Sequence, residues 1–212
     1  TGVDITSYGG DLPGRPSLGQ LVRRVLAAVP DLKRLRLSSI DPAETDDELL
    51  RLLAEEPRLA GHLHLSLQAG SDMILKRMKR RHLTSDALRL AADARRRRPD
   101  LVLGADLIAG FPTETNAMFQ ETLDHVAALD LAWLHVFPYS PRPGTPAATM
   151  ADQVAPAVMD DRLQRLQAAI NRDQAAFNAA TIGKSCAILI ERDGKHPGQK
   201  IGKSPWLQSV VI

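Results

Sequence analysis

Short apolar runs alternate with amphipathic helical patterns along most of the chain up to Ser140. The runs are centred near Leu35, Leu65, Leu107 and Val136, and each interval is long enough for a helix that returns the chain to the next parallel strand. This alternation predicts consecutive βα units around a parallel sheet, so the predicted fold class is α/β. The pattern fits either a barrel or an open sheet covered on both faces.

Capping residues mark where the helices between these strands should begin. Ser17, Asp46 and Thr115 each precede an apolar stripe with helical spacing, and their side-chain oxygens can accept hydrogen bonds from the first free N–H groups. Thr84 opens a further helix, which we expect to end before Pro99 because proline cannot continue the hydrogen-bond ladder.

The pattern changes after Thr145, which predicts three parts at residues 1–150, 151–181 and 182–212. The middle part has apolar residues at helical spacing and predicts one long helix that packs on the body or links two domains. The last part has strand-like pieces at 185–190 and 207–212 around a turn-rich segment. It is too short for a core of its own, so we expect it to be truncated or to depend on the body.

The chain contains a single cysteine, Cys186, among 212 residues. This count excludes an internal disulfide and any multi-cysteine zinc or iron–sulfur site built by this chain alone. The apolar runs are too short to cross a membrane, and nothing near Thr1 resembles a secretory signal. We therefore expect a cytoplasmic protein without a membrane partner, whose natural N-terminus lies upstream of Thr1.

The formal net charge of +2 is too small to identify a nucleic-acid partner by itself. The local distribution is more informative, because residues 76–82 and 95–98 are densely basic. The tail adds further cations that could contact phosphates, namely Lys184, Arg192, Lys195, Lys200 and Lys203.

Polar side chains gather where the predicted strands end, which is where parallel sheets bind their ligands. These candidate residues are Ser38, Ser39, Ser66, Gln68, Asp106, Gly110, Glu114, Tyr139, Ser140 and Arg142. Asp106 stands inside an apolar strand, where a carboxylate is costly unless it receives hydrogen bonds, so a ligand hydroxyl or a cation is a plausible partner. For any single residue of the set, loop solvation or helix capping is the more ordinary role.

Two other patterns carry less weight. His62 and His64 fall on one strand face and could chelate a metal, but no third ligand is assured, so we expect no metal site in this chain. The tetrapeptide Ile-Gly-Lys-Ser occurs twice and matches the end of a phosphate-binding loop, but Asn178 and Pro197 stand where that motif demands glycine.

Five segments, taken in order, resemble the radical S-adenosylmethionine methylthiotransferases. They are RLRLSSIDP (34–42), HLHLSLQAGS (62–71), LKRMKRR (75–81), DLIAGFPTET (106–115) and HVFPYSPRPGTPAA (135–148). Within that family the first, second and fifth segments look like the branch that modifies threonylcarbamoyladenosine in tRNA. Ala69 and Thr113 depart from the family pattern, which usually has serine and glycine at these positions.

The resemblance implies a partial (β/α)6 radical-SAM-type barrel at 1–150, a linking helix at 151–181 and the start of a TRAM-like RNA-binding β module at 182–212. It implies that the intact enzyme adds a methylthio group to N6-threonylcarbamoyladenosine at position 37 of tRNA. S-adenosylmethionine and two 4Fe-4S clusters would serve as cofactors, with an electron donor and the anticodon region of tRNA as partners. The cluster cysteines would lie outside this chain, so the chain alone should be inactive.

The resemblance also implies roles for the strand-end residues, although it assigns no catalytic residue in this chain. Ser66 and Gln68 would reach the ribose or carboxylate of S-adenosylmethionine, and Arg80 would bind that carboxylate. The adenosine would lie along Asp106, Gly110 and Glu114. The substrate nucleotide would face Ser38, Tyr139, Ser140 and Arg142.

The residues leave two other functions open. A complete barrel acting on a phosphorylated metabolite as an aldolase or hydrolase would need neither iron nor S-adenosylmethionine. A non-catalytic tRNA-binding adaptor would bind RNA and have no cofactor pocket.

Overall fold

The structure, a computed structural model that describes residues 4–212, is built on a sheet of four parallel strands in the order β1-β2-β3-β4. The strands are β1 (Ser39–Ile40), β2 (His62–Gln68), β3 (Val102–Ala109) and β4 (Trp133–Pro138). Strands that are consecutive in sequence are neighbours in space. Connections between parallel strands are right-handed as a rule, so a strand order that advances in one direction puts every connecting helix on the same face of the sheet. The sheet is therefore wound like part of a barrel and not as an open sheet covered on both faces.

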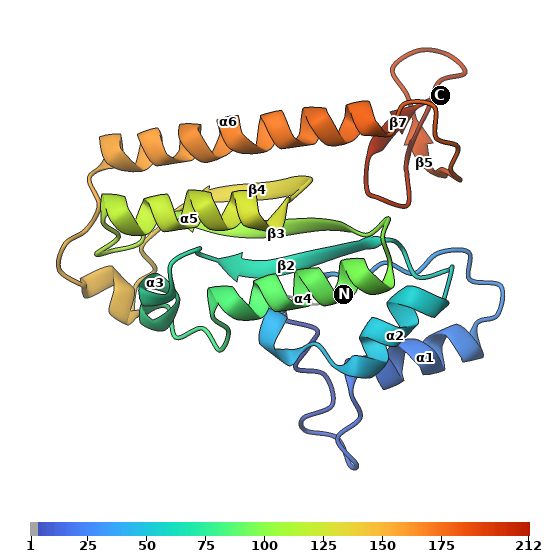
Figure 1. Ribbon diagram of the computed structural model, residues 1–212, viewed down its shortest axis with the longest axis horizontal. Helices are drawn as coiled ribbons and strands as arrows, with labels where there is room; N and C mark the ends of the chain where they lie inside the picture. The colour runs from blue at the N-terminus through green and yellow to red at the C-terminus, as the bar shows by residue number, and fades with distance from the viewer. Residues whose placement is uncertain (1–3) are drawn as a thin grey trace.

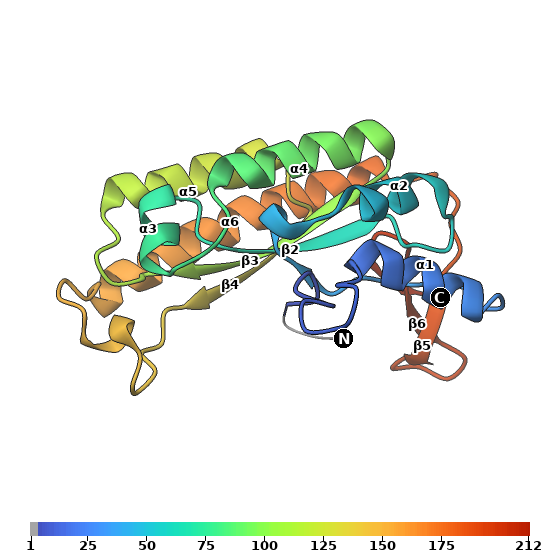
Figure 2. The same ribbon diagram turned by 90° about the horizontal axis from the view of Figure 1, so that it is seen from below.

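The helices cover one face of this sheet, as Figures 1 and 2 show for α4 (Thr84–Arg97) and α5 (Asn116–Leu129). The long α6 (Pro156–Ala180) packs along β4 and against α5. At the β1 side, α2 (Asp47–Glu55) packs on α4, and α1 (Leu18–Ala28) packs on α2. Three short helices complete the body: η1 (Pro42–Glu44), α3 (Asp72–Arg77) and η2 (Pro146–Thr149).

The predicted helix caps at Ser17, Asp46 and Thr115 are confirmed. Their side-chain oxygens accept from the backbone N–H groups of Gln20 at 3.2 Å, Leu49 at 2.9 Å and Met118 at 3.2 Å, respectively. Thr84 begins α4 as predicted, but its own N–H donates to the carboxylate of Asp72 at 2.8 Å. The start of α4 is thereby tied to α3, a short helix that the sequence did not reveal.

The core lies between the sheet and the helices. On β2 and β3 the side chains that face the helices are almost completely buried: Leu63, Leu65, Leu67, Leu103, Ala105 and Leu107. Alanines 87, 91 and 94 of α4 are equally buried, and their small side chains let the helix approach the sheet closely. Since burying one leucine contributes roughly 2 kcal/mol, this layer holds the strands in register.

The first predicted strand is shorter than expected. The backbone of Leu35 pairs with the segment before β2. Its N–H donates to Arg58 O and its C=O accepts from Ala60 N–H, both at 2.8 Å. The chain then diverges and rejoins β2 only at Ser39 and Ile40. Leu35 and Leu37 still face the core. The predicted apolar side of this segment is therefore confirmed, although the hydrogen-bond ladder with β2 is interrupted between Leu35 and Ser39.

The C-terminal part forms a separate three-stranded antiparallel sheet of β5 (Leu189–Asp193), β6 (Lys200–Lys203) and β7 (Ser209–Val211). The strands expected at 185–190 and 207–212 are present but shifted, and β6 begins within the segment that was interpreted as turn-rich. Residues 182–212, which contain this small sheet, are called the C-terminal module below and contact the body at the amino ends of the parallel strands.

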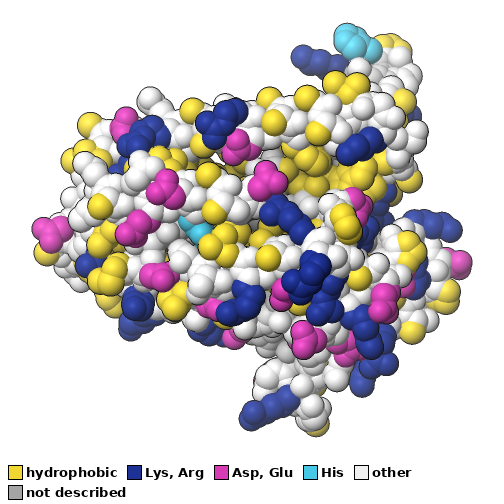
Figure 3. Space-filling model, in the orientation of Figure 1, with side chains coloured by type: hydrophobic (Ala, Val, Ile, Leu, Met, Phe, Trp, Pro, Cys, Tyr) yellow, Lys and Arg dark blue, Asp and Glu magenta, His cyan; other side chains and the backbone are white. Residues whose placement is uncertain are grey.

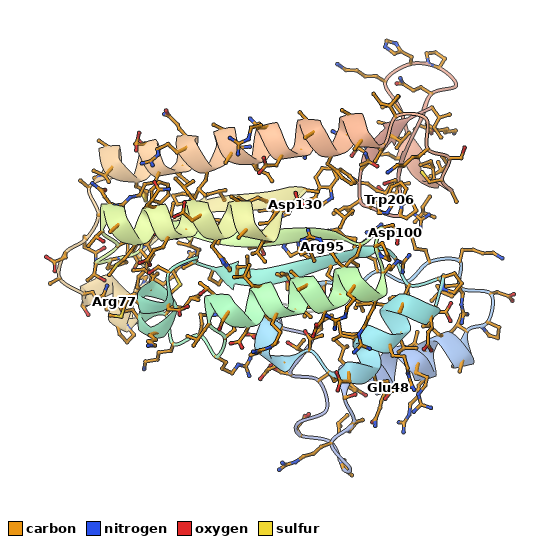
Figure 4. All side chains as sticks on the ribbon, viewed as in Figure 1. Glu48, Arg77, Arg95, Asp100, Asp130 and Trp206 are labelled. Carbon is orange, nitrogen blue, oxygen red and sulfur yellow. The ribbon has the colours of Figure 1, made fainter. Side chains whose placement is uncertain are left out.

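Side chains of the body hold the C-terminal module through its backbone carbonyls. The Arg34 guanidinium donates to Lys203 O at 2.9 Å and to Ala187 O at 2.8 Å, and Arg36 donates to Ser204 O at 3.0 Å. The indole N–H of Trp133 donates to Trp206 O at 2.8 Å, and Figure 4 shows where Trp206 lies in the module. Within residues 4–212, no helix is both long enough and apolar enough to cross a bilayer.

Candidate functional site

The face of the sheet opposite α4 and α5 carries polar and aromatic side chains. His62, His64 and Ser66 alternate along β2 with the leucines that face the helices, and side chains on a strand project alternately to its two faces. The same alternation puts Gly104 and Asp106 of β3 on this surface, together with Trp133, His135 and Phe137 of β4. We call this surface the open face.

Unusual backbone conformations gather at the carboxyl ends of the strands, where a ligand site was predicted. Gln68 ends β2 with φ +66°, next to a register shift between Leu65 and Gln68. Gly110, after β3, has φ +78°, and Thr113 has φ +70°. A left-handed residue other than glycine costs on the order of 1 kcal/mol, and such strain is concentrated at functional sites.

Gly110 opens a turn that a buried ion pair fixes in place. The carboxylate of Glu114 accepts from Gly110 N–H and from the Arg162 guanidinium, both at 2.9 Å. Arg162 also donates to Asn116 at 3.0 Å and lies over the Phe119 ring. Burial raises the pKa of Glu114, and this effect exceeds the lowering by Gly110 N–H and by the positive charge of Arg162.

Glu114 therefore anchors the turn to α6, and its predicted contact with an adenosine stays a prediction. Sequence reasoning missed Arg162. The signal was present, because Arg162 occupies the helical stripe of α6 that also carries the buried Leu166 and Ile170, where an arginine needs a buried partner.

Arg80 lies beneath the carboxyl end of β2. Its guanidinium donates to the Asp41 carboxylate at 3.2 Å and to Ser66 O at 3.0 Å. Burial raises the pKa of Asp41, but hydrogen bonds from His82 and from Ala43 N–H, with the charge of Arg80, outweigh it, so that the pKa lies below its usual value. Arg80 therefore lies beside the backbone of Ser66 with part of its guanidinium already engaged, and its predicted contact with the cofactor carboxylate stays a prediction.

Asp106 belongs to a cluster of imidazoles on the open face. One carboxylate oxygen lies 2.9 Å from His64 Nε2 and 3.0 Å from His135 Nδ1. Burial raises the pKa of Asp106, but the hydrogen bonds and charges of the two histidines outweigh it and lower the pKa. His135 was not predicted, although its position on the same strand face as Trp133 and Phe137 is readable from the period of two.

His62 lies buried next to this cluster. Its ring centroid is 6.2 Å from that of His64. Burial, followed by the positive charge of Arg36, lowers the pKa of His62 to about 3. The ring is therefore neutral at physiological pH.

The residues predicted to face a substrate nucleotide lie in different surroundings. Tyr139 N–H donates to Ala109 O at 2.8 Å, and its ring packs edge-on against Phe111 with the centroids 5.3 Å apart. Ser38 precedes β1 and is partly buried, whereas Ser140 and Arg142 follow β4 in an exposed segment. Tyr139 therefore adjoins the Gly110 turn, whereas Arg142 lies in the exposed segment that follows β4.

The fit of the expected cofactors can be judged from the donor groups. Cys186 is the single cysteine, is exposed and lies in the C-terminal module, so the cysteine ligands of a 4Fe-4S cluster are not available in this chain. At the carboxyl ends of the strands, the hydroxyls of Ser71 and Tyr139 are buried without a hydrogen-bond partner in the described chain. A ligand with several hydrogen-bonding groups, such as an adenosine that carries an amino acid, fits that end of the sheet.

Several arginines of the basic runs are engaged by contacts within the protein. Arg81 pairs with Asp4 and Glu44 at 2.7 and 2.6 Å, and Arg98 donates to Leu53 O and Leu59 O. Figure 3 shows acidic side chains interspersed among the basic ones on the face in view. Arg81 and Arg98 are therefore weak candidates for phosphate contacts, and in the tail Lys200 likewise pairs with Asp193.

Comparisons with known proteins agree with this fold. The family model of the Radical SAM superfamily matches residues 2–126. Among solved structures, coproporphyrinogen III oxidase (HemN) of Escherichia coli, a radical SAM enzyme, has a TM-score of 0.61 at 24% identity, with 76% of this chain and 38% of that chain covered. At this identity the likeness concerns the fold.

Curated relatives are more similar in sequence. A tRNA-2-methylthio-N(6)-dimethylallyladenosine synthase of Erythrobacter litoralis is 53% identical over 99% of this chain, which covers 47% of that protein. The threonylcarbamoyladenosine tRNA methylthiotransferase MtaB of Rickettsia prowazekii is 49% identical over 91% of this chain, which covers 46% of that protein. The chain thus spans about half the length of these relatives. With more than half of its residues matched by the family model, the chain belongs to the radical SAM superfamily.

Proposed function

We propose that this chain is the cofactor- and substrate-positioning part of a radical SAM tRNA methylthiotransferase that acts in the cytoplasm. The observation that carries the proposal is the 53% and 49% identity to two enzymes that modify tRNA adenosines. The chain covers about half of each relative and has one cysteine. The segments that bind two 4Fe-4S clusters would therefore come from outside residues 1–212.

S-adenosylmethionine held on one of the clusters would supply the radical that removes hydrogen from the substrate adenine. In this chain, Ser66, Gln68 and Arg80 would bind the ribose and carboxylate of that cofactor. The Gly110 turn, fixed by the Glu114–Arg162 pair, would lie along the adenosine. These roles are supported by the position of Gln68 and Gly110 at the carboxyl ends of two neighbouring parallel strands and by the strained backbone of Gln68.

The proposed substrate is N6-threonylcarbamoyladenosine beside the anticodon of a tRNA. Ser38, Tyr139, Ser140 and Arg142 would face the nucleotide, since tyrosine and arginine can stack on an unpaired base. The C-terminal module at 182–212 would be the start of a TRAM-like RNA-binding unit, joined by residues 151–181, and its lysines would contact phosphates. An electron donor would reduce the cluster, and no membrane would take part.

The test is a nucleoside analysis with the cluster-bearing enzyme that contains this chain. The enzyme is purified without oxygen and incubated with S-adenosylmethionine, a reductant, a sulfide source and tRNA that carries threonylcarbamoyladenosine or dimethylallyladenosine. We expect a methylthio product from the first tRNA and little from the second, and no product with residues 1–212 alone.

The other outcomes have distinct meanings. A methylthio product only from dimethylallyladenosine would reassign the substrate and keep the reaction class. Binding of tRNA with no S-adenosylmethionine cleavage by the cluster-loaded enzyme would contradict the proposal and favour an adaptor.

A further inference from the structure

We propose that His64, Asp106 and His135 on the open face form a binding site for one divalent transition-metal ion. The sequence suggested a chelating histidine pair at His62 and His64 but offered no third ligand. The structure brings the carboxylate of Asp106 and the imidazole of His135 to the same place, from two neighbouring strands. This inference stands independently of the proposed function, because it uses only side chains within residues 4–212.

The geometry of the three side chains suits such an ion. Asp106 Oδ1 lies 2.9 Å from His64 Nε2 and 3.0 Å from His135 Nδ1, and the three ligand atoms all lie within 4.8 Å of one another. Nitrogen and oxygen ligands about 2 Å from a tetrahedral zinc ion are about 3.4 Å apart. The Asp106 oxygen needs to separate from each of these two nitrogens by only a few tenths of an ångström to admit the ion.

A second observation points to a ligand at this place. His62 is only 2% exposed, and neither of its ring nitrogens has a hydrogen-bond partner in the described part of the chain. An unpartnered buried polar group is costly. A Cβ added to Gly104 would lie 3.1 Å from both His62 Nε2 and His64 Nδ1, so the two imidazoles project over the one residue of β3 that has no side chain.

The donor set indicates the class of ion. Two imidazoles and one carboxylate suit zinc and iron(II), whereas magnesium and calcium prefer oxygen ligands only. Three protein ligands leave at least one coordination position open, as in catalytic zinc sites. The His135 side chain is 62% exposed, so that position is accessible from the open face, and the buried His62 lies beside the His64 ring.

The test is metal binding by the 212-residue chain after chelator treatment and removal of any purification tag. Equilibrium dialysis against zinc should give one bound ion per chain, and cobalt(II) should give visible d–d absorption without a thiolate charge-transfer band. His135→Ala and Asp106→Asn should each weaken zinc binding by at least about tenfold, because residues that only hydrogen-bond to a metal ligand already contribute about that much. His196→Ala and Cys186→Ser, in exposed positions of the C-terminal part, are the controls and should leave binding unchanged.

Either of two results would overturn the proposal. One is the absence of zinc binding above that of the His135→Ala variant, with circular dichroism showing both proteins folded. The other is stoichiometric binding that both site variants retain. If Asp106→Asn does not fold, the variant at the exposed His135 decides alone. Zinc X-ray absorption of the cluster-bearing enzyme is a second measurement. Scattering from two imidazoles around the zinc supports the site, and absence of that scattering overturns it.

Discussion

Replacing Arg162 with methionine should destabilise the fold strongly, because it strands a buried carboxylate. The side chains of Arg162 and Glu114 are 3% and 1% exposed. Without the guanidinium, the Glu114 carboxylate keeps only the N–H of Gly110 as a partner, and Asn116 loses a donor. Removing one member of a buried ion pair typically costs 3–5 kcal/mol, so we expect Arg162→Met to lower the free energy of unfolding by about 3 kcal/mol or more.

The double variant Glu114→Gln/Arg162→Met isolates the stranded charge as the cause. Glutamine still accepts from Gly110 N–H but carries no charge, and replacing both members of a buried pair is often close to neutral. The double variant should therefore be more stable than Arg162→Met by about 2 kcal/mol, although it contains one more substitution.

The loss of stability in Arg162→Met should also depend on pH. Burial already raises the pKa of Glu114 in the native protein, and loss of Arg162 removes an interaction that lowers it. A group whose pKa is higher in the folded state stabilises the fold below its unfolded pKa, and this stability is lost as the pH rises through the folded value. The deficit of Arg162→Met should therefore be smaller at pH 5 than at pH 8.

The assay is urea denaturation followed by circular dichroism at both pH values. The matched control is Arg96→Met on α4, where an exposed pair with Asp93 should contribute about 0.5 kcal/mol or less. A loss below about 1 kcal/mol for Arg162→Met, or a double variant no more stable than the single one, would refute the reasoning.

Three further expectations follow from the same structure. Thr115→Ala removes the oxygen that caps α5 and should cost about 1 kcal/mol in urea denaturation, and no loss would count against the cap. Arg34→Ala removes two hydrogen bonds to the C-terminal module and should speed its limited proteolysis while the body stays protected; an unchanged rate would mean that other contacts hold it. The lowered pKa of Asp41 means that its contribution is present above the unfolded pKa and lost as the pH falls through the folded one. Asp41→Asn should therefore lose less stability than the native protein between pH 5 and pH 3, and parallel losses would contradict this.

The parts of the fold that were predictable depend on local patterns. Alternating leucines identify β2, and the oxygens of Ser17, Asp46 and Thr115 identify three helix starts, since each signal lies within a few residues of its effect. The winding of the sheet was not readable, because it depends on which strands become neighbours. β6 was missed because it is only four residues long and begins within the turn-rich segment, although it pairs with the strands next to it in the sequence.

The residues of the candidate site also divide into those that local sequence patterns predict and those that depend on contacts between distant parts of the chain. Strand-end residues such as Gln68 and Gly110 could be proposed from the sequence because parallel strands present their carboxyl ends together, and both residues have unusual φ angles. Glu114 is also polar at a strand end, but its partner Arg162 is 48 residues away in the chain. The meeting of Asp106 with His64 and His135 likewise needs the register of three strands, which no local pattern contains.

The central claim is that the carboxyl ends of the parallel strands bind S-adenosylmethionine. The direct measurement is calorimetric titration of the anaerobic, cluster-bearing enzyme with this cofactor, comparing the native protein with Gln68→Asn. Asparagine tolerates the left-handed backbone of this position but shortens the amide, and Gln208→Asn in the C-terminal module is the matched control. We predict that Gln68→Asn raises the Kd about tenfold, or about 1.4 kcal/mol, while the control leaves it unchanged; equal Kd values for all three proteins would contradict the claim.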